Sequence, residues 1–166
     1  MSIILRIALE LLAAVLLALG LRRHVFLLVF VKGHSMMDTL RNADLVFATR
    51  RHKGNSIKRF DVVLCRYPNR RELFIKRVIA LPNEVISMAE DTVFINGEAI
   101  EENYPRRRCM RKIEETRLAD NEYFVMGDNR PVSRDSRAKN VGPIPDFNIV
   151  TVVRGVILPL RRARKI

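Results

Sequence analysis

Apolar residues gather first in one long run and afterwards in many short ones. The long run covers residues 3–21, where only Arg6 and Glu10 are charged. At a rise of about 1.5 Å per residue, a helix of this length measures roughly 28 Å, close to the ~30 Å hydrocarbon thickness of a bilayer. Arg6 and Glu10 lie four positions apart, so they share one helical face and can form an ion pair. The pattern predicts an N-terminal membrane anchor over residues 1–23 and a separate domain over residues 24–166.

Two other interpretations of this segment stay open. A cleavable signal peptide would have a basic region before the apolar run and a small-residue cleavage site, which residues 18–20 match weakly. A core helix of a soluble domain would carry a polar face, and residues 11–19 provide none. The topology is also open, because Arg22, Arg23 and Lys32 follow the run and the positive-inside rule by itself favours a cytoplasmic domain.

Beyond residue 24 the apolar runs are short and rich in β-branched and aromatic residues, which favours strands. Turn-forming residues separate several of them, and Asn96-Gly97 between two runs predicts a two-residue hairpin. Many short strands on such connections predict a mostly-β domain. The expected strands are residues 25–31, 44–49, 61–67, 73–80, 84–88, 92–95, 98–100, 123–126 and 149–158. The charged segments 50–59 and 103–118 are expected to be loops, and residues 161–165 a frayed basic end.

The composition adds a strong positive charge to this picture. The chain has 166 residues, enough for one domain with a core, and 30 Lys+Arg against 18 Asp+Glu give a formal net charge of +12. Such a surface prefers polyanions, either nucleic acid or the anionic face of a membrane. No helix-turn-helix, zinc-ligand or RNA-recognition pattern accompanies the charge. We therefore expect membrane phospholipid, and no nucleic acid, as a partner.

Cys65 and Cys109 form no disulfide framework, and neither they nor His24, His34 and His52 stand at metal-ligand spacing. We expect free thiols and no bound metal. Pairing of the two cysteines in an oxidising compartment is the alternative.

Two residues are candidates for nucleophilic catalysis. Ser35 lies in a turn between two apolar runs, where reactive groups are usually presented. In the expected strand 73–80, Lys76 shares one face with Phe74, Val78 and Ala80, so its amine is placed to be buried. Burial lowers the pKa of a lysine from about 10.4, and a neutral amine can take the proton of a serine hydroxyl. The alternatives are an ordinary turn serine and a surface lysine at a strand edge.

A third segment, residues 127–137, is dense in turn formers and short polar side chains. It is either a structural loop in which carboxylates and arginines lock one another, or a loop that also holds a lysine amine in one direction. A hydroxyl suits the second role because it binds a neutral amine without adding charge.

Taken together, SMMDTL at 35–40, KRVIALPNE at 76–84 and GDNRPVSRDSR at 127–137 resemble the three conserved segments of bacterial type I signal peptidases, in order and spacing. The resemblance runs from the apolar segment to about residue 160. It implies a signal-peptidase/LexA-like all-β catalytic domain behind one N-terminal transmembrane helix, on the outer face of the cytoplasmic membrane. The implied activity is removal of N-terminal signal peptides from secretory preproteins with small residues at the first and third positions before the cut. The implied route is an ester acyl-enzyme without metal or cofactor, and we expect a monomer.

The same resemblance assigns roles to individual positions. Ser35 matches the nucleophile, with its backbone N–H donating to the oxyanion, Lys76 matches the general base, and Ser133 matches the hydroxyl that orients the lysine amine. Met36 matches a residue lining the substrate groove. Supporting positions are implied at Arg77, Asp128, Asp135 and Arg137.

Two positions depart from the family pattern. Asp38 stands where proline is usual, and we expect its carboxylate to cap the local turn; turned toward Lys76, it would favour the ammonium and weaken the base. Gly33 stands where many members carry a serine hydroxyl as a second oxyanion donor, a group worth ~2.7–4 kcal/mol in the transition state. These departures keep two alternatives open: a catalytically weak or silent membrane-associated binding module, and a specialised maturation protease of the same superfamily.

Overall fold

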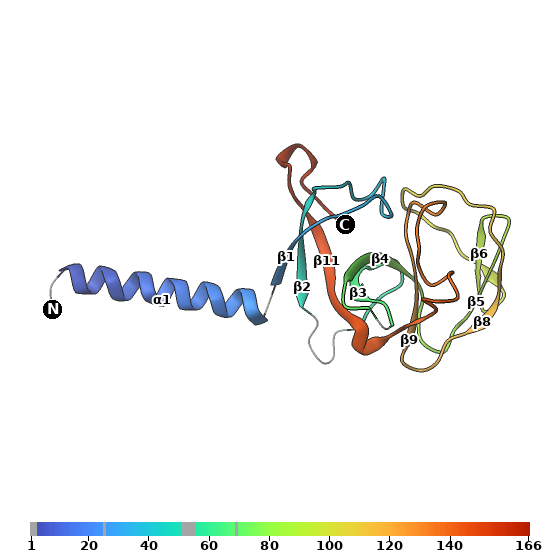
Figure 1. The fold of residues 1–166 in the computed structure, drawn as a ribbon, viewed down its shortest axis with the longest axis horizontal. Helices are drawn as coiled ribbons and strands as arrows, with labels where there is room; N and C mark the ends of the chain where they lie inside the picture. The colour runs from blue at the N-terminus through green and yellow to red at the C-terminus, as the bar shows by residue number, and fades with distance from the viewer. Residues whose placement is uncertain (1–2, 25, 51–55, 69) are drawn as a thin grey trace.

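The computed structural model describes residues 3–24, 26–50, 56–68 and 70–166. One helix, α1 (Ile3–His24), projects from one end of a mostly-β domain (Figure 1). The other elements are β1 (Phe26–Phe30), β2 (Leu45–Arg50), β3 (Val62–Arg66), β4 (Leu73–Ala80), β5 (Val85–Ala89), β6 (Thr92–Ile95), β7 (Glu98–Ala99), β8 (Ile113–Arg117), β9 (Glu122–Met126), β10 (Ile144–Pro145), η1 (Asp146–Asn148), β11 (Ile149–Leu158), η2 (Leu160–Arg162) and β12 (Arg164–Lys165).

The strands form two antiparallel sheets. The larger has the order β1-β2-β11-β3-β4-β9-β10, with β12 paired to β11, and the smaller has the order β7-β6-β5-β8. The larger sheet lies next to α1, and the smaller sheet occupies the far end of the molecule (Figure 1). Strand β4 is central to the fold, because it pairs with β3 and β9 and its last residues, Val78, Ile79 and Ala80, are fully buried.

The expected mostly-β domain is confirmed, and each predicted strand overlaps an observed one. In the predicted hairpin, Asn96 and Gly97 have φ values of 52° and 84°, and Ile95 pairs with Glu98. These are the positive φ values that a tight two-residue hairpin turn requires. Residue 25 and residues 51–55, from a predicted strand and a predicted loop, lie outside the described residues.

Two expectations about charged segments are wrong. Part of the predicted loop 103–118 is strand β8, an edge strand whose Glu114 and Glu115 face solvent, so its polarity hid the β pattern. The basic end is ordered by contacts distant in sequence: β12 pairs with β11, and Arg162 forms an ion pair with Asp44 at 3.1 Å.

Helix α1 follows the predicted apolar run and keeps large apolar side chains exposed, among them Ile4 and Leu17. Arg6 Nε lies 3.1 Å from Glu10 Oε1, as their spacing predicts. Over the part of the chain that the structure describes, no helix combines the length and the hydropathy needed to cross a membrane.

Both cysteines are free, as expected, with Cys65 buried and Cys109 half-buried. Burial raises the pKa of the Cys65 thiol to about 12, so this thiol is neutral at physiological pH.

Candidate active site

Ser35 lies in the turn that connects β1 to β2, and Asn129 holds this turn from the side. The backbone N–H of Asn129 donates to the Ser35 carbonyl at 3.0 Å, and its side-chain amide donates to the His34 carbonyl at 3.0 Å. Gly33 has a φ of +92°, in the region that favours glycine, and its N–H donates to Asn42 Oδ1 at 3.0 Å. The backbone conformation itself therefore favours glycine at the position where the family often has serine.

Lys76 reaches Ser35 from the middle of β4. Its amine donates to Ser35 Oγ at 2.8 Å and to the Ile75 carbonyl at 3.0 Å. Only 3% of Lys76 is exposed, which confirms the predicted burial. This burial lowers the pKa of Lys76, although the carboxylates of Asp135 and Asp128 act in the opposite direction. A lysine in this environment gives up its proton more easily than one in water.

Arg77, the next residue of β4, forms a buried ion pair on the opposite face of the strand. Its guanidinium donates to both carboxylate oxygens of Asp128, at 2.9 and 2.7 Å, and lies 4.0 Å from the centre of the Tyr104 ring. Thr39 also donates to Asp128. Bidentate arginine–carboxylate pairs fix geometry, so Arg77 and Asp128 fasten the segment after Ser35 to β4 and to the loop that follows β9.

A second ion pair, between Asp135 and Arg137, braces that loop from within. Arg137 donates to both oxygens of Asp135, at 2.7 and 2.8 Å, and the Gly127 N–H donates to the same carboxylate at 2.9 Å. Burial by itself would raise the pKa of Asp135, but the hydrogen bonds and charge of Arg137 hold it below its usual range.

Ser133 lies in this loop, beside the nucleophile turn. A Cβ added at Gly127 would fall far inside van der Waals distance of both Ser133 Oγ and the Ser35 carbonyl oxygen. Ser133 Oγ is buried, and a hydrogen bond from this hydroxyl also helps to hold the pKa of Asp135 below its usual range. The structure thus brings Ser133 next to the Ser35 backbone, while the Lys76 amine binds Ser35 Oγ and the Ile75 carbonyl.

Two cavities meet at Ser35 and Lys76. One has a volume of about 130 Å³ and is lined mainly by apolar side chains, including the buried Met36 and Leu64. The other is more open, about 650 Å³, and its lining includes Arg107 and Arg134. The pair therefore stands between a small apolar pocket and a wider basic groove.

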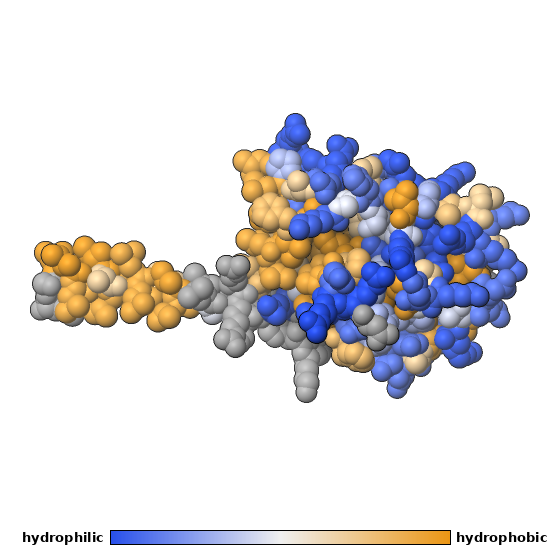
Figure 2. Space-filling model, in the orientation of Figure 1, coloured by the Kyte–Doolittle hydropathy of each residue, from blue (hydrophilic) through white to orange (hydrophobic). Residues whose placement is uncertain are grey.

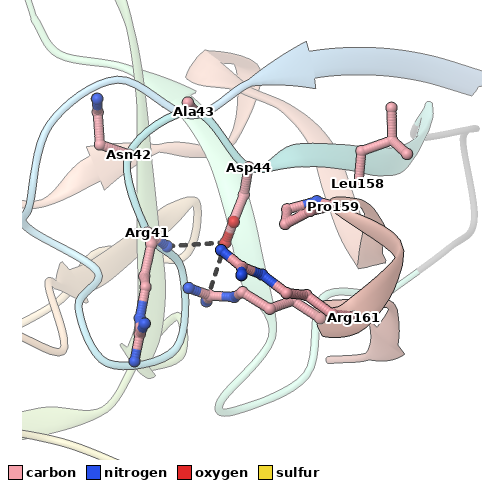
Figure 3. Close-up of a pocket in the computed structure, with 8 residues that line it drawn as sticks. Arg41, Asn42, Ala43, Asp44, Leu158, Pro159 and Arg161 are labelled. Carbon is pink, nitrogen blue, oxygen red and sulfur yellow. Dashed lines mark hydrogen bonds and ion pairs between the residues drawn. The ribbon is translucent and has the colours of Figure 1, made fainter.

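A further cavity, of about 800 Å³, shares no lining residue with these two (Figure 3). Its Asp44 carboxylate accepts the Arg41 backbone N–H at 2.8 Å and pairs with Arg162. These contacts hold η2 against the start of β2.

Asp38 does not point its charge at the lysine. Its carboxylate lies 3.5 Å from the Arg107 guanidinium, and both side chains are about half exposed. The carboxylates that act on the pKa of Lys76 are Asp135 and Asp128. The contact found for Asp38 is this ion pair with Arg107, in place of the expected turn cap, and the effect of Asp38 on cleavage stays a prediction.

Residues 102–107 make contacts with the site that the sequence did not predict, because residues 103–118 were expected to be a solvated loop. Buried Arg130 pairs with Glu102, donates to Tyr104 Oη at 2.8 Å and donates to the Gly127 carbonyl at 3.1 Å. The backbone N–H of Arg107 donates to the Asp128 carbonyl at 2.9 Å. The local signal was the number of opposite charges in residues 102–107 and 127–137, and this number does not indicate which charges pair.

A turn serine in contact with a buried lysine, on a mostly-β scaffold, is the arrangement of hydrolases that use a Ser–Lys pair. The sequence profile of the family described as signal peptidase, peptidase S26, matches residues 4–158. The chain therefore belongs to the peptidase S26 family and is a serine peptidase.

Individual proteins agree with this assignment. The chain is 32% identical over 163 residues to signal peptidase I T of Bacillus subtilis (strain 168), a match that covers 92% of this chain and 84% of that protein. It is 33% identical over 166 residues to signal peptidase I of Bacillus licheniformis, covering 92% and 87% of the two chains. The crystal structure of a signal peptidase I from Enterococcus faecalis V583 has a TM-score of 0.52 and 26% identity, and the match covers 59% of this chain and 97% of that one.

Proposed function

We propose that this chain removes N-terminal signal peptides from secretory preproteins, with Ser35 as nucleophile and Lys76 as general base. The observation that carries this proposal is the 2.8 Å contact between Lys76 Nζ and Ser35 Oγ, made by a lysine that is 3% exposed. A neutral buried amine at this distance is placed to take the hydroxyl proton.

The reaction proceeds in two halves. Ser35 Oγ attacks the scissile carbonyl carbon while its proton moves to Lys76 Nζ, and the Ser35 backbone N–H donates to the oxyanion. The lysine ammonium then gives this proton to the departing amine, which leaves an ester between Ser35 and the signal peptide. Water attacks the ester, Lys76 takes the water proton, and the ammonium returns a proton to Ser35 Oγ as the bond breaks. No step requires a metal or a cofactor.

The supporting residues act by holding these groups in place. Arg77 and Asp128 fasten the segment after Ser35, Asp135 and Arg137 brace the loop that carries Ser133, and Met36 lines the small apolar cavity. A Ser133 hydroxyl that orients the Lys76 amine remains a prediction, supported by the burial of Ser133 beside the nucleophile turn. A cavity of about 130 Å³ favours small side chains before the scissile bond.

We also propose that residues 1–23 anchor the protein in the cytoplasmic membrane as a single transmembrane helix, and that residues 24–166 form a monomeric domain on the outer face. The anchor rests on the length of the apolar run over residues 3–21 and not on the hydropathy of the described helix. On the face that Figure 2 shows, hydrophobic residues predominate on α1 and on the edge of the domain nearest to it. Exposed apolar residues of the domain include Phe30 on β1, the strand that follows α1, which is 64% exposed, and Leu160, which is 79% exposed. These residues favour contact with membrane phospholipid. A long domain can be translocated regardless of its charge, so the basic residues after α1 do not oppose this topology.

The alternative of a silent binding module rests on Asp38 and Gly33. The argument from Asp38 was that its carboxylate would favour the ammonium form of Lys76. Asp38 pairs with Arg107 instead, which removes this argument. A specialised maturation protease would use the same chemistry on other substrates. The two functions are therefore distinguished by which preproteins the enzyme cleaves.

The test is cleavage of a model preprotein by the full chain in detergent and phospholipid, with Ser35→Ala in parallel. Ser87→Ala, on β5 of the smaller sheet, is the matched control. We expect cleavage at the signal junction by wild type and the control, and none by Ser35→Ala. Cleavage by Ser35→Ala would refute the nucleophile, and a folded wild type that cuts no preprotein would favour the silent module. Protease treatment of intact cells tests the topology, since protection of the domain would place it in the cytoplasm.

A further inference from the structure

We propose that the basic groove beside Ser35 is a subsite that selects acidic side chains in the first residues after the scissile bond. The inference rests on the proposed function and adds a substrate preference to it. The groove is the open cavity of about 650 Å³, and its basic lining residues are Lys32, His34, Arg107 and Arg134 besides the Lys76 base. We call it the basic groove.

The lining of the basic groove carries an unbalanced charge. Lys32 and Arg134 are exposed, the side chain of Arg107 is half exposed, and none of the described residues that line the groove is acidic. Walls that carry one sign of charge concentrate the field in a cleft, which attracts the opposite charge. A substrate segment with carboxylates fits this groove better than a neutral or basic one.

The direction of the substrate follows from the two cavities. They share Lys32, Gly33, Ser35, Phe74 and Lys76. A peptide with its scissile carbonyl at Ser35 Oγ therefore has one side in each cavity. The small apolar cavity accepts small side chains, which under the proposed function precede the cut. The residues that follow the cut therefore cross the basic groove.

The ion pair between Asp38 and Arg107 sets the strength of this preference. Asp38 lies 3.5 Å from Arg107 and partly neutralises it, whereas Arg134 and Lys32 remain as cations of the groove. The backbone N–H of Arg107 donates to the Asp128 carbonyl, and its guanidinium contacts Asp38 and, at 3.5 Å, Met37 Sδ, which places it at the edge of the site. Removing the Asp38 charge exposes the full charge of Arg107 to the substrate.

The test compares three preproteins that differ only in the second residue after the cut: Glu, Gln or Lys. The measurement is the ratio of kcat/KM values within each enzyme, in neutral detergent, so that a change in overall activity cancels. We expect wild type to prefer Glu over Lys by about two- to fivefold, the range of one exposed ion pair. Higher salt should reduce this ratio.

Three variants locate the preference. Arg134→Gln should bring the ratio toward one, Arg134→Glu should invert it, and Asp38→Asn should increase it. Arg117→Gln is the matched control, an exposed arginine on β8 that does not line the groove, and it should keep the wild-type ratio.

The outcomes separate this inference from the proposed function. Equal cleavage of the three preproteins, or a ratio unchanged in Arg134→Gln, would overturn the subsite and leave signal peptide cleavage standing. If folded wild type cut none of the three preproteins, the proposed function would fail. A binding experiment would then test whether the basic groove selects acidic residues. In that experiment, labelled peptides that span the junction are titrated into Ser35→Ala, and equal affinities for the Glu and Lys peptides would refute the basic groove as a subsite.

Discussion

Lys76 Nζ lies 2.8 Å from Ser35 Oγ, although 41 positions separate the two residues. The contact exists because the central strand β4 carries the lysine and three consecutive residues of the loop after β9 hold the serine turn. Asn129 binds the turn directly, Asp128 joins Thr39 to Arg77, and Gly127 leaves room for the Ser35 carbonyl. The geometry of the pair therefore depends on the loop after β9 as much as on β4.

Replacing Lys76 separates its chemical role from its structural one. Lys76→Arg keeps a cation that does not lose its proton at accessible pH, so preprotein cleavage should fall by about 100- to 10,000-fold, the usual contribution of a general base. Lys76→Met should lose cleavage as well but remain folded, and be at least as stable at pH 7, because it removes a buried ammonium. Cleavage assays and urea unfolding measure the two effects. Activity retained by Lys76→Arg would show that another group takes the proton.

The lowered pKa of Lys76 gives a definite pH dependence. Its neutral form is the base, so kcat/KM for preprotein cleavage should rise with pH and level off below the 10.5 of an ordinary lysine. Between the lowered pKa and 10.5 the unfolded chain binds more protons at this residue than the folded chain, so the free energy of unfolding should also increase with pH. Subtracting the unfolding curve of Lys76→Met from that of wild type isolates this contribution. A difference that decreases with pH would contradict the assignment.

The Arg77–Asp128 ion pair should be a major source of stability. Asp128→Ala leaves the buried guanidinium without its carboxylate, and breaking a buried pair in this way costs about 3–5 kcal/mol. Asp120→Ala, at an exposed position, is the control and should change the free energy of unfolding by less than about 0.5 kcal/mol. Denaturant titration measures both. Equal stability of the two variants would mean that solvent reaches Arg77.

The parts of the fold that local pattern determines were predictable from the sequence. Strand β4 and the Asn96-Gly97 hairpin follow from alternation and turn chemistry within a few residues. Strand β8 and the ordered basic end were not, because charged edge strands and ion pairs such as Arg162 with Asp44 depend on partners far along the chain. Local pattern says which residues are charged, and packing decides which charges meet.

The same distinction holds at the candidate site. Burial of Lys76 followed from its neighbours on one strand face, and the candidate positions of the other segments came from their resemblance to a family. Asn129 and Thr39 were missed as contacts of the site, since an amide and a hydroxyl in polar turns carry no distinctive signal. The pairing of Asp38 with Arg107 lies outside the family pattern, and only the folded structure brings those two residues together.

Gly127→Ala tests whether the loop after β9 must touch the nucleophile turn. The added methyl group would overlap Ser133 Oγ and the Ser35 carbonyl oxygen, and both the loop and the turn are held by buried ion pairs that resist movement. We expect a loss of about 1–3 kcal/mol in the free energy of unfolding, typical of an overpacked core, and a fall in kcat as Ser35 moves from Lys76. Gly20→Ala is the control: nothing lies within 4 Å of its added methyl group, and alanine favours the helix, so cleavage should stay at the wild-type rate. If Gly127→Ala cleaves and unfolds like the control, the turn can shift without loss, and the Ser35–Lys76 distance does not depend on this contact.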